Sequence, residues 1–457
     1  MNQTNQTNHA LYKTVKKMVP AVLIAMISTA AGLLSLYHSD VPMIQDFGSM
    51  LTIGIVIAFI VALFIFLPFL YMKDKHFPSH HVHQEKIDKP NKIVQNLVQG
   101  VMNAKYMILL VAVLLAGIGF YFDLDAKAET NLENFMPQDS QALEDIRALR
   151  TAIGSTEQIA LVFEFDNVFT SNGLQLIDET QSYLNQNFDV YITEMLSLVT
   201  LFNQMGINDQ LMMNETTLSS IPVNQQKLLI NESRTKSVIN ISIVEMSDET
   251  FEGFIQDLST YLSGIDTTAE ITITGQSMID VEMMESLTSG RYEITILGLV
   301  LIFISLLVIY KSLYRALIPL IPIVLIIGWS GGIMAIFGIS YTPLTATLGA
   351  LIMGIGTEFT ILITERYEEE KLKVDNHEDA IKIALSKMAN PILVSALTTM
   401  GGFSALILSD FVILSNFGIM TLVNLSLALL STIIVLPAIL ALKTTKKVEV
   451  MEPVYSA

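Results

Sequence analysis

Residues 342–370 of the chain read TPLTATLGALIMGIGTEFTILITERYEEE, an apolar stretch that encloses one acidic residue and ends in a run of charges. A membrane span needs about 20 mostly apolar residues at a rise of 1.5 Å per residue. The acidic residue, Glu358, follows Thr342 by 16 positions and precedes Glu365 by seven. This stretch therefore predicts a membrane-spanning helix with a carboxyl group within it.

The composition indicates that the chain holds several such stretches. Hydrophobic residues make up 51% of the 457 residues and charged residues only 15%, whereas an average soluble chain has about 25% charged residues. Similar stretches predict eight spans, grouped three and five: about 19–37, 48–72, 106–122, 294–310, 316–337, 342–364, 391–408 and 413–442. The expected fold class is a polytopic α-helical membrane protein.

Basic residues flank alternate ends of these spans. They lie before the first span, between the second and third, between the fourth and fifth, and after the last, and include Lys13, Lys16, Lys17, Lys73, Lys75, Lys86, Lys89, Lys92, Lys105, Lys311, Arg315, Lys443, Lys446 and Lys447. The other connections, 38–47, 338–341 and 409–412, contain no Lys or Arg. Because basic residues favour the cytoplasmic side, we expect both termini in the cytoplasm and residues 123–293 outside.

Residues 123–293 have the composition of a soluble domain. They hold 28 of the 44 acidic residues and 7 of the 26 basic residues, which accounts for the net charge of −18. Periodicity predicts alternating helices and strands, with residues 200–235 left unassigned: helices at 140–153, 174–184 and 249–262, and strands at 158–165, 238–245 and 270–274. The order favours a small extracytoplasmic α+β domain of the split βαβ type.

An internal repeat connects the first two spans with the last two. Eight residues recur 370 positions later: Thr29, Gly32, Leu36, Ser39, Asp40, Phe47, Gly48 and Met50 correspond to Thr399, Gly402, Leu406, Ser409, Asp410, Phe417, Gly418 and Met420. The first span has the basic flank and small residues of a signal peptide. A signal peptide would not have a counterpart within a membrane domain, so the repeat favours a retained span.

The repeat implies that residues 19–72 are the end of one half and that about 100–442 form a complete second half. Internal duplication is common in transporters. We expect the carboxy-terminal part of a longer duplicated protein, or a half encoded separately. The expected parts are a disordered start (1–18), two spans (19–72), a cytoplasmic linker (73–105), one span (106–122), the acidic domain (123–293), five spans (294–442) and a cytoplasmic tail (443–457).

Glu358 is the main candidate for function, because an ionisable group within a span costs about 2.5–3.5 kcal/mol even on translocon-based scales. Ala350, Gly354 and Glu358 are spaced by four, which predicts one helix face. Small residues allow a neighbouring helix to approach, so Glu358 is expected to point into the bundle and to carry protons reversibly. The alternative is a structural hydrogen bond, with Glu358 permanently protonated.

Asp40 and Asp410 occupy matching turns of the two repeats. They are candidates for a proton path, and helix capping is an equal alternative. No phosphate-binding glycine loop follows a soluble strand, and the chain has no cysteine. The histidines of HFPSHHVH, residues 76–83, are read as a linker and not as a metal site. We therefore expect no enzyme activity, no cofactor and no metal.

The order of spans and domain, with the duplicated ending, resembles half of a resistance–nodulation–division (RND) exporter of the MMPL type, a prokaryotic hydrophobe exporter. The resemblance rests on GIGTEFTILITERYEEE (354–370), supported by NPILVSALTTMGGFSAL from Asn390 and LSDFVILSNFGIM from Leu408. It places Glu358 at the family's proton-relay acid, Phe359 where the family has Tyr, and Ala350, Gly354 and Gly356 as support of the relay helix.

The resemblance implies proton-driven export of lipids or other amphiphilic molecules from the cytoplasmic membrane of a prokaryote. It also implies a porter-like outer domain and a homo-oligomer or a missing first half, with no nucleic acid as partner. A membrane accessory or lipid-sensing protein that binds a lipid or a partner through residues 123–293 is the alternative. A truncated gene product is a third possibility.

Overall fold

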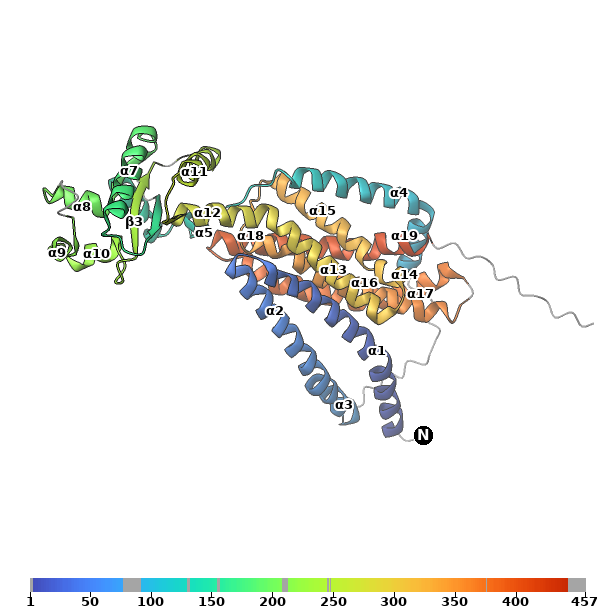
Figure 1. The fold of residues 1–457 in the computed structure, drawn as a ribbon. Coiled ribbons are helices and arrows are strands. Elements are labelled where there is room, and N and C mark those ends of the chain that lie inside the picture. The colour runs from blue at the N-terminus through green and yellow to red at the C-terminus, as the bar shows by residue number, and fades with distance from the viewer. Residues whose placement is uncertain are drawn as a thin grey trace, which may run out of the picture. The chain divides into compact units, whose positions relative to one another are not determined.

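The computed structural model describes residues 3–76, 92–129, 132–153, 157–207, 213–244, 246, 248–374 and 376–442. The chain forms two compact units (Figure 1). The helical unit comprises Met1–Glu129, Asn134–Met136 and Ser286–Ala457, and the α+β unit comprises Thr130–Glu133 and Pro137–Glu285. Each unit is described by itself below.

The helical unit is built from long helices joined by short turns. Its elements are α1 (Gln3–Leu34), η1 (Ser35–His38), α2 (Pro42–Val61), η2 (Ala62–Phe66), α3 (Leu67–His76), α4 (Lys92–Asp123), η4 (Ser286–Gly290), α13 (Arg291–Tyr310), α14 (Leu313–Leu317), α15 (Leu320–Phe337), η5 (Thr345–Thr347), α16 (Leu348–Lys371), α17 (His377–Ile407), α18 (Val412–Leu430), η6 (Ser431–Val435) and α19 (Leu436–Leu440). The short helix α5 (Leu132–Phe135) lies where the two units share the chain.

Eight helical stretches within the described residues are long and apolar enough to span a membrane, as predicted. They are Val19–His38, Pro42–Lys73, Gln95–Asp123, Gln276–Tyr310, Leu313–Phe337, Thr345–Lys371, His377–Ile407 and Val412–Leu440. We refer to the two ends of this bundle as the Asp123 end, where α4 stops, and the Lys371 end, where α16 stops.

The prediction of a disordered start is wrong for the described part, because α1 runs without a break from Gln3 to Leu34. The polar residues before the span lack glycine and proline, and a helix that forms in the membrane can propagate into them. The expected linker is shortened in the same way, since α4 begins at Lys92. The remaining histidines of the HFPSHHVH segment, from His80 on, lie outside the described residues.

The predicted domain 123–293 extends too far at both ends. Polar residues at each boundary belong to the helical unit, among them Asp123 and Arg291. Composition assigned these charges to a soluble domain, but they are buried within the helical unit at 2% and 7% exposure. The two residues form an ion pair there, so these charged side chains are buried and not in contact with water.

The two hairpins of the internal repeat have the same local structure. In each, a serine hydroxyl accepts a bond from the backbone N–H two residues later: Ser39 from Val41, and Ser409 from Phe411, both at 3.2 Å. The second helix of each hairpin contains a π-helical turn, at Ala62–Phe66 and at Ser431–Val435. Phe47 and its counterpart Phe417 pack edge to face, with ring centroids 5.8 Å apart.

The α+β unit contains a four-stranded antiparallel sheet. Its strands are β1 (Gln158–Glu164), β2 (Ile192–Leu196), β3 (Lys236–Ile243) and β4 (Glu270–Thr274), in the order β2-β3-β1-β4. Its helices are α6 (Gln141–Ile153), α7 (Ser171–Asn187), α8 (Leu198–Gln204), α9 (Glu215–Leu218), α10 (Val223–Leu229), α11 (Asp248–Ser263) and α12 (Gln276–Glu285). With a helix between β1 and β2 and another between β3 and β4, this is a split βαβ arrangement.

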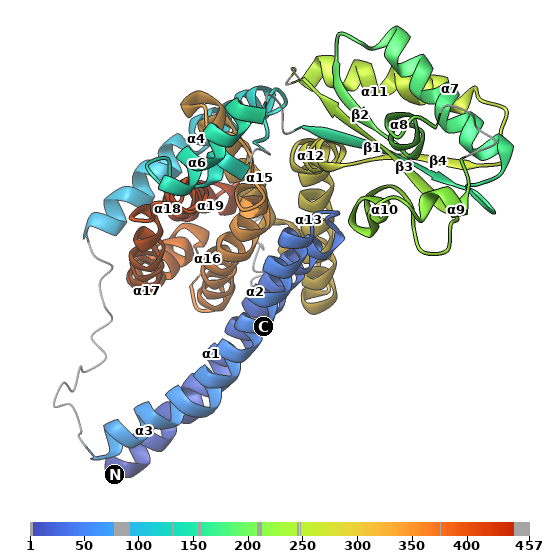
Figure 2. The same cartoon turned by 90° about the vertical axis from the view of Figure 1, so that its left-hand side faces the viewer.

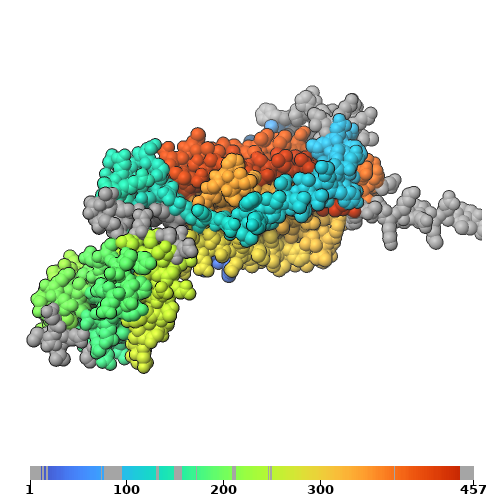
Figure 3. Space-filling view, turned by 90° about the horizontal axis from the view of Figure 1, so that it is seen from above, coloured from blue at the N-terminus to red at the C-terminus, as the bar shows by residue number. Residues whose placement is uncertain are grey.

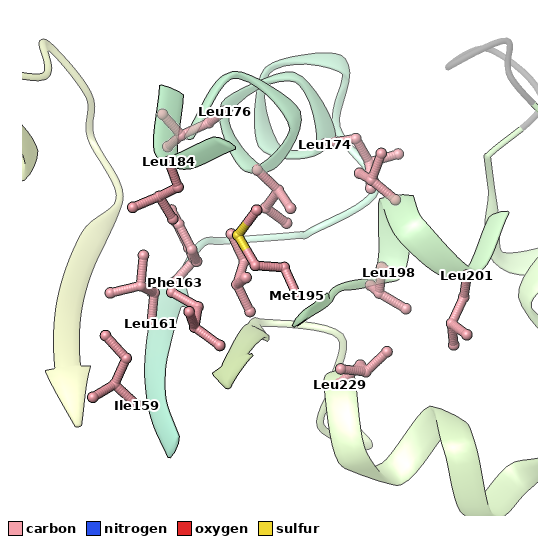
Figure 4. Packing of buried hydrophobic residues seen from close by; sticks show 14 of the residues in the cluster. Ile159, Leu161, Phe163, Leu174, Leu176, Leu184, Met195, Leu198, Leu201 and Leu229 are labelled. Atoms are coloured by element: carbon pink, nitrogen blue, oxygen red, sulfur yellow. The ribbon is translucent and has the colours of Figure 1, made fainter. Parts of the chain in front are cut away.

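The core of the α+β unit lies on one face of this sheet (Figure 4). Side chains alternate along a strand, so Ile159, Leu161 and Phe163 of β1 are all fully buried. Leu174 and Leu184 of α7 pack in the same cluster. The alternation that predicted β1 is therefore the pattern that builds the core.

Candidate functional site

Helix α16 lies in the middle of the helical unit. It contacts α1, α13, α15, α17 and α18, and Figure 2 shows it between α17–α18 on one side and α1 and α13 on the other. Most of its side chains are buried, including Ala350 and Phe359 at 2% and 1% exposure. The helix therefore stays surrounded by protein, and a polar group on it is held in a defined place.

Glu358 differs from its neighbours on α16 because its side chain is exposed. The described helices therefore do not enclose the Glu358 side chain as they enclose Ala350 and Gly354, and its role in the bundle stays a prediction. An α-helix has 3.6 residues per turn, so each step of four residues turns the side chain about 40° further around the axis. Gly354 still faces α1, whereas Glu358 has turned out of that contact.

Gly354 and Gly356 set the packing distance of α16. The Thr29 hydroxyl of α1 donates to the Gly354 carbonyl at 3.0 Å, and a Cβ at Gly354 would lie 2.8 Å from Thr29 Cγ2. A Cβ at Gly356 would lie 3.4 Å from Ile323 Cγ1 of α15. Both glycines support the helix as the sequence predicts, and Gly354 has almost no room for a side chain.

The threonines that follow on α16 have their hydroxyls satisfied by helix carbonyls. Thr357 donates to Met353 O at 2.6 Å, and Thr364 donates to Thr360 O at 2.7 Å. Thr360 contacts both Gly356 O at 3.0 Å and Pro319 O at 3.2 Å. Phe359 is buried and has no hydroxyl. These residues stabilise the helix, and none of them forms a described hydrogen bond with Glu358.

Asn424 of α18 is a polar residue that the sequence analysis missed. It is 4% exposed, and neither its amide nitrogen nor its amide oxygen has a hydrogen-bond partner among the described residues. It lines a cavity of about 10 Å³ together with Gly356 of α16 and Thr421, which is close to the volume that one water needs. An amide within an apolar helix gives only a weak signal in the sequence.

Charged residues form a network at the Lys371 end. Glu370 is 3% exposed and pairs with Arg366 at 2.7 Å and with Lys387 of α17 at 3.1 Å. Lys373, beyond the span, bonds Glu369 and Glu370; burial acts to lower its pKa, but these two carboxylates raise it. The charged residues therefore connect α16 with α17 through ion pairs, in addition to forming the end of α16.

A second buried cluster lies at the Asp123 end. Asp123 pairs with Arg291 at 2.7 Å and accepts hydrogen bonds from Tyr292 at 2.6 Å and Tyr341 at 2.7 Å. The Arg291 guanidinium also lies over the Tyr341 ring, 3.7 Å from its centroid. Burial raises the pKa of Tyr341, so this phenol stays a neutral donor. The four residues come from three separate segments, which is why the sequence analysis did not group them.

Asp40 and Asp410 both lie exposed at the turns of their hairpins. Neither side chain caps the following helix: the residues at those caps are Val41 and Phe411, and the preceding serines make the side-chain bond. The capping alternative is therefore wrong. A role in a proton path stays a prediction.

An apolar groove of about 590 Å³ runs along α4, α15 and α18–η6. Figure 3 shows this face, with α15 visible between α4 and the red helices α18 and α19. Its lining extends along α4 from Ala104 to Phe122, about 27 Å of helix at 1.5 Å per residue. The groove thus follows the whole depth of one span.

Comparison with known proteins points to one family. The model of the MMPL family matches residues 1–72 and 233–453. A membrane protein of Methanocaldococcus jannaschii is 24% identical over 360 residues, which cover 74% of this chain and 89% of that protein. A Mycobacterium tuberculosis protein named probable transport protein MmpL12 is 28% identical over 190 residues, which cover 40% of this chain and 16% of its own length.

Solved structures share the fold at low identity. The hedgehog release protein Disp of the water bear Hypsibius dujardini has a TM-score of 0.70 and 14% identity, over 97% of this chain and 61% of that one. SecDF of Thermus thermophilus, a translocon-associated membrane protein, has a TM-score of 0.55 and 14% identity, over 95% of this chain and 50% of that one. The chain spans about half to three fifths of these larger molecules.

Proposed function

Because the chain belongs to the MMPL family, we propose that it is an RND-type exporter that uses a proton gradient to move lipids or other amphiphilic molecules, with Glu358 as the acid that carries the proton. The helical unit provides the spans and the α+β unit lies outside the membrane.

The observation that carries this proposal is the position of Glu358. It lies within the span Thr345–Lys371, with an exposed side chain and no described hydrogen-bond partner. An ionisable group at this depth is costly and is kept mainly where it has a function. A group that changes charge with its surroundings is what a proton carrier needs.

Two further observations support the direction and the cargo. The basic residues of the sequence flank the Lys371 end, and the positive-inside rule favours the cytoplasm for that end and the outside for the Asp123 end. The groove along α4 has apolar walls at the depth of the span, so it suits an acyl chain. The apolar substrate is taken up from the bilayer on this face.

The test is lipid export in membrane vesicles that contain the full chain and hold an imposed pH gradient. We expect Glu358→Gln to abolish gradient-driven movement of a fluorescent phospholipid and Glu358→Asp to keep part of it, because only a titratable carboxyl can release the proton. The matched control is Glu293→Gln, which removes an exposed acid from another span, α13. Undiminished transport by Glu358→Gln would contradict the proposal and favour an accessory role.

A further inference from the structure

The α+β unit contains three triplets of the form Asn-x-Ser/Thr, in which the asparagine can accept a sugar chain. They begin at Asn214, Asn231 and Asn240. The sequence alone does not distinguish among them. The structure does, because the asparagine Nδ2 must form the new bond and the hydroxyl of the third residue must be accessible for the triplet to be recognised.

Asn231 is closed off by its own turn. Its Nδ2 donates to Ser233 Oγ at 2.8 Å and to Thr235 Oγ1 at 2.9 Å, and its Oδ1 accepts from two backbone N–H groups, both at 2.9 Å. Both hydrogens of Nδ2 are therefore used, and the Ser233 hydroxyl that completes the triplet is bound as well. A sugar on this Nδ2 would remove at least one of these bonds.

Asn240 is closed off by the sheet. It lies in β3, a strand with a neighbour on each side, and it pairs with Ala160 of β1 and with Leu196 of β2. Such a strand has ladder hydrogen bonds on both of its edges. An enzyme therefore cannot take residues 240–242 into an active site unless the sheet opens.

Asn214 is accessible. It directly precedes α9, and Figure 2 shows α9 at the edge of the α+β unit. Asn214, Glu215 and Thr216 are all exposed. Among the described residues, neither the Asn214 Nδ2 nor the Thr216 hydroxyl has a hydrogen-bond partner. Both groups that the triplet requires are thus free in the folded chain.

The oxygen of the Asn214 amide has a separate role. Oδ1 accepts from the backbone N–H groups of Thr216 and Thr217, both at 3.1 Å, and so caps α9. A side-chain oxygen at this position satisfies N–H groups that have no partner within the helix. Replacement of one Nδ2 hydrogen by a sugar leaves these bonds intact, so the modification is compatible with the cap.

We propose that Asn214 is a site of N-glycosylation in the folded chain. The donor is an oligosaccharide linked to a membrane lipid through phosphate, and the catalyst is a membrane transferase of the host cell. Nδ2 attacks the anomeric carbon, the bond between that carbon and the phosphate oxygen breaks, the lipid phosphate leaves, and Nδ2 gives up one proton. The proposal rests on the position of the α+β unit outside the membrane in the proposed function, since such donors are used on that side.

The test is mass spectrometry of the full chain purified from the membranes of its native host. We expect a glycan on Asn214 and none on Asn231 or Asn240. Asn214→Asp should lose the glycan and keep the melting temperature, because its carboxylate retains a cap oxygen. Thr216→Ala should also lose the glycan, whereas Thr216→Ser should retain it with its hydroxyl. An unmodified Asn214, or a glycan on Asn231 or Asn240, would overturn the proposal.

A labelling experiment separates this result from the orientation of the unit. The chain has no cysteine, so single cysteines can replace Gln225, which is exposed on α10, and Leu372, which is exposed directly after α16. We expect a membrane-impermeant maleimide to label Gln225→Cys in intact cells and to leave Leu372→Cys unlabelled. A labelled Gln225→Cys with an unmodified Asn214 overturns the glycosylation site alone. An unlabelled Gln225→Cys overturns the orientation as well. Neither readout needs transport, so both are separate from the result of Glu358→Gln.

Discussion

Asp123 and Arg291 lie 168 positions apart and form a buried ion pair. Arg291 also donates to the Asp123 backbone carbonyl at 2.9 Å, and a Cβ at Gly331 would lie 2.7 Å from Asp123 Oδ1. The carboxylate is thus enclosed by an arginine, two tyrosines and a glycine. An analysis of short sequence stretches assigns Asp123 and Arg291 to the polar boundary of a domain, because each residue's charge partner lies in a distant segment.

We expect Asp123→Ala to destabilise the helical unit by about 3–5 kcal/mol, because it leaves the Arg291 charge buried and unpaired. The double variant Asp123→Leu/Arg291→Met should recover most of this loss, because apolar replacements of a buried pair are often neutral. Denaturation of the purified chain in detergent measures both values. Asp40→Ala, an exposed acid of the same kind, should stay within about 0.5 kcal/mol of the parent. Equal losses in Asp123→Ala and the double variant would contradict this account.

Glu358 marks the limit of sequence reasoning at the residue scale. Its position within a span follows from counting apolar residues on either side. The direction of its side chain does not, because a spacing of four drifts around the helix axis and the neighbours α1 and α17 are set by the tertiary fold. The sequence therefore predicted where the carboxyl lies along α16 but not which way it points.

At the scale of elements, glycines allow the helices α4 and α15 to approach until their backbones are in contact. A Cβ at Gly119 would overlap the carbonyl oxygen of Gly328, and a Cβ at Gly332 would lie 2.7 Å from Gly119 Cα. Trp329, the single tryptophan of the chain, donates from Nε1 to the Ala112 carbonyl of α4 at 3.0 Å. Gly119, Trp329 and Gly332 also line the apolar groove, so the close contact of the two backbones forms part of its wall.

We expect Gly119→Ala to destabilise the helical unit by about 1–3 kcal/mol through overpacking. Gly117→Ala on the same helix should be neutral or stabilising, because no atom lies within 4 Å of its Cβ and alanine favours a helix by up to about 1 kcal/mol. Thermal unfolding followed by the fluorescence of Trp329 reports directly on this helix pair. Similar melting temperatures for the two variants would argue against the close contact.

The elements of the α+β unit show why some strands are predictable. Residues 270–274 were predicted as a strand and form β4 with the same bounds, because Ile271 and Ile273 alternate with polar residues. The strand β2, Ile192–Leu196, was missed, since its register on β3 is irregular between Ile192 and Glu194. Within 200–235, the described residues 200–207 and 213–235 form short helices separated by turns, and these helices are too short to show a period.

At the scale of the whole molecule, the charge is divided between the two units. Thr130–Glu133 and Pro137–Glu285 contain 24 acidic and 5 basic residues. Like charges repel within a compact body and destabilise it. Repulsion between acidic side chains therefore lowers the stability of the α+β unit, and salt ions that screen this repulsion should raise it.

We expect salt to stabilise the α+β unit selectively. Backbone amides of β1 and β3 should exchange hydrogen more slowly in about 1 M than in about 0.01 M sodium chloride, because salt shortens the screening length from about 30 Å to about 3 Å. Hydrogen exchange of the full chain in detergent measures this. Amides of α15, an apolar helix within the bundle, serve as the internal control and should not change. Equal responses of α15 and β1 would contradict an effect of charge.

The π-helical turns at Ala62–Phe66 and Ser431–Val435 indicate the order of events in the evolution of the molecule. Such turns are rare, and these two occupy the same place in the second helix of each matched hairpin. Each turn ends two residues before one of the matched prolines, Pro68 and Pro437. Independent origin would require the same backbone defect to arise twice. The π-helical turn is therefore older than the duplication, and the second helix of each hairpin has inherited it.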